Sequence, residues 1–322
     1  MRFPFSQSVF LTALCGVAFA PLASAITIRD DTPDSSYLTL GADPTYQAAG
    51  FFSGGSFGGT LITDPFGLNE YVVTATHPRR GGAGSSPGSS TFTIGGNAYG
   101  VSAIFSAPGY NSSTQQNDLS VIRLSAPVTG VTPVQYYTGT AELNKTVTAI
   151  GYGFSGTGLT GGVTADSQRR GMNNVIDVLD ASTISAGLPS TSYLFDFDNP
   201  SGTSNSLSLL NTGGKANSSA SALSLEGSLA AADSGGGEFA MIGGTLYLVG
   251  VNSYIAAPST NPDAANPDGH YGDIDGATRV SLFSEFIAQT VPEPGPAALL
   301  VGGLAVCGGL CRRRGGSVGP AR

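Results

Sequence analysis

Short apolar stretches separated by Gly, Ser, Asn and Pro run through most of the chain. Their β-branched and aromatic residues suit a pleated, half-buried surface, so each stretch predicts a strand. The predicted strands cover residues 59–62, 71–74, 91–94, 119–124, 146–150 and 246–251. A helical spacing of apolar residues occurs over 281–288, and the polar segments 81–90 and 201–224 are expected to be surface loops. Strands followed by one late helix favour barrels or sandwiches over βαβ units.

The N-terminal end has a different pattern. Residues 1–25 combine a basic start, a mostly apolar stretch over 9–20 and the small-x-small sequence Ala-Ser-Ala at 23–25. This arrangement is typical of a signal peptide, with a first core strand or helix as the alternative interpretation. Cleavage at this site would leave Ile26 as the new N-terminus and would export the protein.

The C-terminal end, 291–322, has three parts. Val-Pro-Glu-Pro at 291–294 precedes a Gly-rich apolar run at 296–311 and three arginines at 312–314. The run is shorter than the ~20 residues of a typical spanning helix. This end resembles the PEP-CTERM sorting signal of Gram-negative bacteria. The resemblance implies an exosortase-type processing enzyme, transient membrane association, and delivery to the cell surface or extracellular matrix; an ordinary tail anchor is the alternative.

Composition and charge narrow the body at 26–290. The whole chain has 14 basic and 22 acidic residues, for a net charge of −8, and the body is more acidic still. We expect no nucleic-acid partner, because this field repels a polyanion. None of the cysteines falls in the body, so it must fold without disulfides or thiolate metal sites. No cofactor or metal is expected, since Asp263, Asp268, Asp273 and Asp275 lack the spacing of an EF-hand loop.

Three short segments carry the candidate chemistry. His77 closes Thr-Ala-Thr-His directly after a predicted strand, and His270 is the other histidine of the body. Asp118 stands at the start of an apolar strand, where a carboxylate needs hydrogen-bonded partners. Ser234 lies in Asp-Ser-Gly-Gly, a turn that lets a hydroxyl project while backbone N–H groups gather around an incoming oxygen.

Serine is a poor nucleophile alone and requires a base that is itself oriented by a third group. His77, Asp118 and Ser234 occur in an order that can supply these roles. Taken singly, each has a plain structural alternative: a strand-end histidine, a turn residue and a loop serine.

Together, the three motifs resemble trypsin-like serine proteases over about 38–288. Supporting blocks are Gly-Gly-Thr-Leu-Ile at 58–62, Gly-Tyr-Gly at 151–153, Leu-Val-Gly-Val-Asn-Ser-Tyr at 248–254 and Thr-Arg-Val at 278–280. The resemblance implies an all-β fold of two antiparallel β-barrels, at about 38–140 and 141–280, and a short helix at about 281–289. It also implies a secreted serine endopeptidase that cleaves protein or peptide substrates through an acyl-enzyme intermediate.

The resemblance further assigns the residues around the serine. The N–H groups of Ser234 and Ala232 would form the oxyanion hole, with Ala232 in place of the usual glycine. If this position needs positive φ, its Cβ costs roughly 1–2 kcal/mol. That departure motivates the alternative function, a weak or inactive protease-fold binding or adhesion module. Asp233 would pair with a new N-terminus at Ile26, or pair internally.

The substrate pocket is assigned in the same way. Ser228 would lie at its base, with Ser253 and Ile255 along its wall. The branched Ile255 narrows the pocket and favours small or medium apolar P1 residues. Asp275 could approach the same base and favour a basic P1 residue instead.

Overall fold

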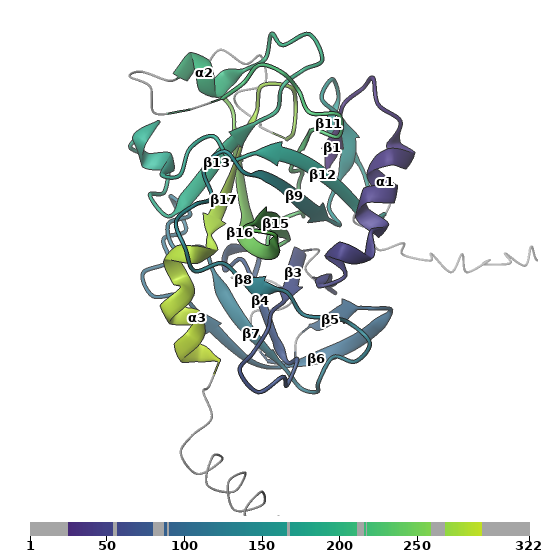
Figure 1. Ribbon diagram of the computed structural model, residues 1–322, viewed down its shortest axis with the longest axis vertical. Coiled ribbons are helices and arrows are strands. Elements are labelled where there is room, and N and C mark those ends of the chain that lie inside the picture. The colour runs from purple at the N-terminus through teal and green to yellow at the C-terminus, as the bar shows by residue number, and fades with distance from the viewer. Residues whose placement is uncertain are drawn as a thin grey trace, which may run out of the picture.

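Two β-structured halves make up the computed structural model, and Figure 1 shows them one above the other. The structure describes residues 25–53, 57–79, 87–88, 90–165, 168–210, 216, 218–258 and 268–291. The predicted signal peptide and C-terminal sorting signal therefore lie outside the described residues, apart from Ala25 and Val291. Most of the predicted loop 81–90 also lies outside them. Within the described ranges, no helix has the length and apolar character needed to cross a membrane.

The N-terminal half is a closed antiparallel barrel with the strand order β2-β3-β4-β7-β6-β5. The strands are β2 (Ala49–Phe52), β3 (Phe57–Leu61), β4 (Tyr71–Thr74), β5 (Thr91–Ile94), β6 (Asn97–Ser106) and β7 (Ser120–Leu124). Their inward side chains form an apolar core in which the Phe52 ring lies 4.7 Å from that of Phe57 and 4.8 Å from that of Phe92. The β-branched runs read from the sequence supply most of this barrel.

The C-terminal half is a curled sheet in the order β12-β9-β15-β16-β17-β13, with β8 paired to β16. Its strands are β8 (Gln135–Tyr136), β9 (Thr146–Gly151), β12 (Arg170–Val175), β13 (Ser192–Asp196), β15 (Gly237–Ile242), β16 (Thr245–Ala256) and β17 (Ile274–Arg279). A smaller sheet beside it contains β1 (Thr27–Ile28), β10 (Ser155–Thr157), β11 (Gly161–Thr164) and β14 (Gly227–Ser228). The predicted class, a trypsin-like pair of β-barrels, is confirmed.

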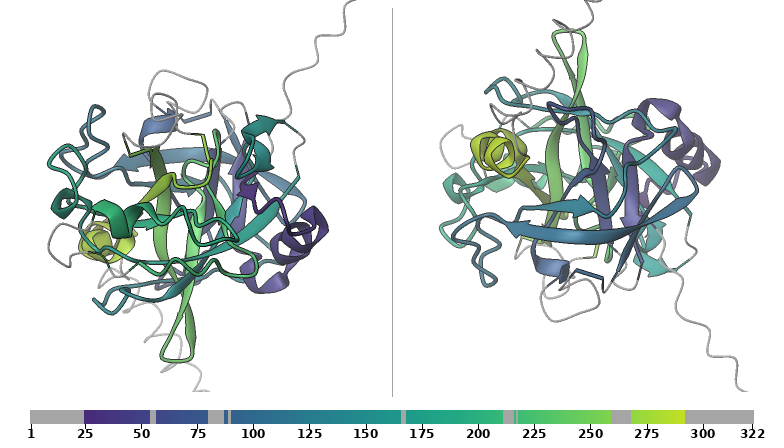
Figure 2. Two further views of the ribbon diagram at one scale, coloured as in Figure 1. Left: turned by 90° about the horizontal axis from the view of Figure 1, so that it is seen from above. Right: turned by 90° about the horizontal axis from the view of Figure 1, so that it is seen from below.

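Three α-helices are present in the described chain: α1 (Asp34–Ala42), α2 (Ser206–Leu210) and α3 (Ser284–Thr290). The 3-10 turns are η1 (Pro44–Tyr46), η2 (His77–Arg79), η3 (Ala181–Thr183) and η4 (Val280–Phe283). Figure 2 shows α1 and α3 on opposite sides of the molecule. The predicted late helix is confirmed as η4 followed by α3, and Ile287 packs into the core of the N-terminal barrel.

Two sequence-based expectations about helices were wrong. No helix was expected over 34–42, but α1 lies there and packs against β12. Segment 201–224 is not simply a surface loop, because it contains α2 and buries the Leu207 side chain completely. The fold then brings the C-terminal end of β4 together with the N-terminal ends of β7 and β15 around one site.

Candidate active site

The N-terminal barrel positions His77 and Asp118 side by side. In the antiparallel pair of β4 and β7, Thr74 lies opposite Ser120, so residues just beyond these strand ends lie together. Asp118 is fully buried, and its Oδ1 accepts the N–H groups of Thr76 and His77 at 2.8 and 2.9 Å. Its Oδ2 lies 2.7 Å from Nδ1 of His77. The imidazole is therefore held in a fixed orientation by a satisfied carboxylate.

The C-terminal half also holds this carboxylate. The Ser253 hydroxyl, on β16, donates to Oδ2 of Asp118 at 2.5 Å. Sequence reasoning had assigned Ser253 to the pocket wall and missed this contact. The two residues are 135 positions apart in the chain, so no local motif links them. Only the register of the folded strands brings them into contact.

Ser234 completes the arrangement from the turn that precedes β15. Its Oγ lies 2.7 Å from Nε2 of His77, so the structure brings all three predicted catalytic residues together. The carbonyl of Ser234 accepts the N–H of Gly58 at 2.8 Å, which fixes the turn against the N-terminal barrel. A Cβ on Gly58 would lie 2.5 Å from Cα of Gly236, so this close approach requires glycine. The Ser234 hydroxyl, the His77 imidazole and the Asp118 carboxylate thus form a continuous hydrogen-bonded chain across the boundary between the two halves.

The backbone beside Ser234 leaves two donors available. Within the described part of the chain, the N–H groups of Ala232 and Ser234 donate no hydrogen bond. Ala232 has φ +72°, in the left-handed region, and Gly235 has φ +78°. The turn therefore adopts the positive-φ conformation in spite of the Cβ of Ala232, which disfavours it by about 1–2 kcal/mol.

Asp233 lies beneath this turn and is completely buried. Its Oδ1 accepts the N–H groups of Tyr152 and Gly153 at 3.0 and 2.8 Å. Its Oδ2 accepts the N–H groups of Ala230 and Ile26, each at 2.9 Å. Burial raises the pKa of this carboxyl to about 6, while the four hydrogen bonds oppose the rise. The predicted partners Ile26 and Asp233 are thus in contact in the uncleaved chain.

A cavity of about 200 Å³ opens beside Ser234. Its other lining residues are Leu229, Ala230, Ala231, Asn252, Ser253, Tyr254 and Ile255. Ser253 and Ile255 thus stand on the wall, as the resemblance implied.

The two residues assigned to the pocket base, Ser228 and Asp275, are fully buried and do not line the cavity. Oδ1 of Asp275 accepts the Ser228 hydroxyl at 3.1 Å and the Leu229 N–H at 3.2 Å. Oδ2 of Asp275 is buried without a hydrogen-bond partner. Burial raises the pKa of this carboxyl well above its ordinary range.

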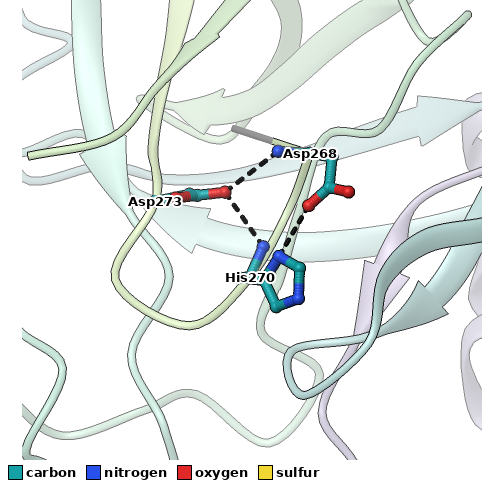
Figure 3. A group of neighbouring side chains, drawn as sticks. All are labelled: Asp268, His270 and Asp273. Atoms are coloured by element: carbon teal, nitrogen blue, oxygen red, sulfur yellow. Dashed lines mark hydrogen bonds and ion pairs between the residues drawn. The ribbon is translucent and has the colours of Figure 1, made fainter. Parts of the chain in front are cut away.

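The other histidine belongs to a separate cluster with Asp268 and Asp273 (Figure 3). Nδ1 of His270 lies 2.6 Å from Oδ1 of Asp268. Oδ2 of Asp273 accepts the N–H groups of Asp268, Gly269 and His270 at 3.0 to 3.2 Å. Ligand atoms of the three side chains lie within 4.8 Å of one another, but Asp273 already serves to hold the loop together. Of the other acids considered as metal ligands, Asp275 is buried against Ser228, and Asp263 is outside the described residues.

A known family model matches part of the chain. The family model described as Trypsin matches residues 41–193, a range that contains His77 and Asp118 and ends before Ser234. A comparison with curated proteins finds no match. Together with the two-barrel fold, the family match supports a trypsin-like serine peptidase, a hydrolase of the chymotrypsin fold.

Proposed function

We propose that the chain is an exported serine endopeptidase that acts through Ser234, His77 and Asp118. The observation that carries this proposal is the hydrogen-bonded path from the hydroxyl through the imidazole to the carboxylate, with 2.7 Å at each step. The same turn presents two unoccupied N–H donors beside the hydroxyl and a cavity next to it.

The geometry supports the following sequence of steps. Nε2 of neutral His77 takes the proton of Ser234 while Oγ attacks a peptide carbonyl, and Asp118 stabilises the imidazolium that forms. The N–H groups of Ala232 and Ser234 then bind the tetrahedral oxyanion. His77 returns the proton to the leaving amine, and water, activated by the same base, hydrolyses the acyl-enzyme.

Activation would follow from removal of the signal peptide. Ile26 has φ +65°, a strained conformation for a β-branched residue in an intact chain. Cleavage before Ile26 removes this torsion and converts its N–H, 2.9 Å from Asp233, into an ammonium that neutralises the buried carboxylate. Both changes favour the cleaved form, so we propose that the export cut is also the activating cut. Internal pairing of Asp233 is the alternative.

The pocket favours small or medium apolar P1 residues. Tyr254 and Ile255 stand on its wall, and Asp275 lies outside the cavity lining, under the floor. One observation supports the second option, a basic P1 residue: the unpartnered Oδ2 of Asp275. Peptides that differ only at P1, with Ala, Val, Leu or Arg, distinguish the two. Arg preferred in the wild type and lost in Asp275→Ser would establish the basic specificity.

The ends of the chain add a location to this proposal. We propose export by the signal peptide and recognition of segment 291–322 by an exosortase-type enzyme at the cell surface of a Gram-negative bacterium. Processing near residue 291 would release the body from transient membrane association. Mass spectrometry of the exported protein tests this directly. A mature species that retains Arg322 would exclude processing.

Labelling of the exported protein with a fluorophosphonate probe tests the activity itself. We expect wild type to be labelled at Ser234 and to cleave a mixed peptide library, and Ser234→Ala to do neither. The strained Ala232 supports a second candidate, a protease-fold binding or adhesion module of the surface matrix. A folded wild type that neither reacts nor cleaves would establish that module instead.

A further inference from the structure

Four carboxylates gather around a second cavity, away from the catalytic residues. This cavity has a volume of about 190 Å³ and lies where the chain leaves β13 and later enters β14. Its lining contains Asp177, Asp196, Asp198 and Glu226, each no more than 4% exposed. The remaining lining residues are Asn144, Asn174, Val175, Ser219, Ser221 and Leu223. None of these described lining residues is basic.

Two of the carboxylates are already engaged by the backbone. Asp196 accepts the Leu207 N–H at 2.8 Å and the Ser218 hydroxyl at 3.0 Å. Glu226 accepts the N–H groups of Asp198 and Leu223 at 2.8 and 2.5 Å. These bonds fix the two side chains in place around the cavity.

The other two carboxylates have no such support. Asp198 is 96% removed from solvent, so water cannot readily hydrate its carboxylate. Its buried Oδ1 also has no hydrogen-bond partner. No hydrogen bond reaches the side chain of Asp177 from the described part of the chain. An unpaired buried carboxylate is strongly unfavourable, so the site lacks a counter-charge.

The Arg29 guanidinium approaches this site, but it is already paired with another acid. Arg29 donates to the carbonyl of Leu223 at 2.6 Å, but it is paired with Asp31 at 2.6 and 2.9 Å. The arrangement is thus unfavourable for four ionised groups unless a cation joins them.

We propose that this cavity binds a calcium ion, held by Asp177 and Asp198 with Asp196 and Glu226 completing the charge. The donors offered by the lining are carboxylate, amide, hydroxyl and carbonyl oxygens, which suit a hard cation, and the described lining has no His or Cys to select a transition metal. The volume leaves room for coordinated water, which calcium accepts in its flexible coordination shell.

An ion at this position would stabilise the segment that leads to the candidate substrate pocket. Glu226 directly precedes β14, whose Ser228 underlies the candidate substrate pocket. The ion joins the exit of β13 to the entry of β14 and so stabilises the segment that leads to the pocket. These four acids were not among the metal ligands considered from the sequence, since they are spread over 50 positions and form no motif.

The test uses the full chain, first treated with EDTA and then titrated with calcium. We expect calcium at a hundredfold excess over Kd to raise the Tm by about 5–10 °C. Terbium bound at the site offers a second readout, because a nearby tyrosine can sensitise its emission. Tyr37 lies beside the site, where its hydroxyl donates to the Glu226 carbonyl at 2.7 Å, and the chain has no Trp to add a background signal. Calcium should displace the terbium emission.

Substitution identifies the site. Asp198→Asn, which removes charge from a side chain without hydrogen bonds, should weaken calcium binding at least tenfold and abolish the Tm rise. Asp177→Asn should have the same effect. It serves as the test variant if Asp198→Asn does not fold. The matched control is Asp268→Asn in the cluster of Figure 3, which should leave both readouts unchanged. Wild type that is indifferent to EDTA and calcium, or a loss of binding in Asp268→Asn alone, would overturn the proposal.

Discussion

The two halves of the molecule are stabilised by different means. The N-terminal barrel closes on itself, and its interior is a continuous apolar cluster. Among its described residues it buries one carboxylate, Asp118. The C-terminal half buries acids throughout: Glu142, Asp177, Asp196, Asp198, Glu226, Asp233, Glu238, Asp273 and Asp275.

Several of these acids hold loops of the open sheet by accepting backbone N–H groups. Asp273 fixes 268–270, and Asp233 joins segments near 26, 152 and 230. No cysteine occurs in the described chain, so these carboxylates stabilise loops that disulfides could otherwise hold. We therefore expect the catalytic residues to act as one unit across both halves. We expect the dependence of stability on charge and pH to lie in the C-terminal half.

The largest effect should come from the triad, which joins the two halves. Ser234→Ala and His77→Ala should each lower kcat by about 10⁶-fold, and the double variant should lose no more, because the members act as a unit. Hydrolysis of a peptide substrate by each purified variant measures this, with Tm as the control for folding. Activity in His77→Ala a hundredfold above that of Ser234→Ala would mean that the halves do not act together.

The next largest effect concerns Asp233 in the cleaved protein. Asp233→Asn leaves the Ile26 ammonium buried without its partner, which costs about 3–5 kcal/mol. Activity should therefore fall by about 10²- to 10⁴-fold. The matched control is Asp64→Asn in the N-terminal barrel, where a partly exposed carboxylate also accepts three backbone N–H groups. Equal losses in the two variants would remove the special role of Asp233.

The same residue predicts a pH dependence. The raised pKa of Asp233, about 6 against an ordinary 3.8, means that the uncleaved folded chain loses stability as pH rises through this window. The ammonium of the cleaved chain stabilises the charged carboxylate and removes that loss. In a Ser234→Ala background, cleavage should raise Tm more at pH 7 than at pH 4. An equal gain at both pH values would contradict the pairing.

Some of the strands could be predicted from the sequence, because β-branched and aromatic runs mark them, whereas others, such as β2, β6 and β17, were not predicted. Predicted 71–74 and 91–94 coincide with β4 and β5. Helix α1 could not be predicted, because it packs through a glycine. A Cβ on Gly41 would lie 2.5 Å from the carbonyl oxygen of Arg169, so the contact face carries no apolar side chain at that point.

Some residues of the candidate site could be predicted from the sequence, and others could not. His77, Asp118 and Ser234 stand in recognisable local motifs, and the structure brings them within hydrogen-bonding distance. The contact of Ser253 with Asp118, and the four acids of the calcium site, come from segments far apart in the chain. Only the register of the folded strands places them together, so local patterns did not indicate them.

A smaller effect should come from Glu238 at the centre of the C-terminal sheet. Tyr193 donates to its Oε2 at 2.6 Å, while Oε1 has no partner. Burial raises its pKa to about 8 from 4.5, so stability falls as pH rises through this range, where the unfolded chain has already released the proton. Glu238→Gln should be several degrees more stable than wild type at pH 9 and similar to it below pH 4.5. Thermal unfolding across pH measures this, and parallel curves would place the pH sensitivity elsewhere.

The smallest effect should come from Ala232→Gly in the turn beside the nucleophile. Glycine relieves the positive-φ strain of about 1–2 kcal/mol, but it also increases the conformational entropy of the unfolded chain, which opposes the gain by about 0.5–1 kcal/mol. The net stabilisation is at most about 1.5 kcal/mol, or roughly 3–6 °C in Tm. Because the two N–H donors are already free in the structure, kcat should change less than threefold. The control is Ala231→Gly, which lacks the positive φ and should lower Tm. An increase of tenfold or more in kcat for Ala232→Gly would show instead that the alanine distorts the oxyanion hole, and that the C-terminal half limits catalysis through this one Cβ.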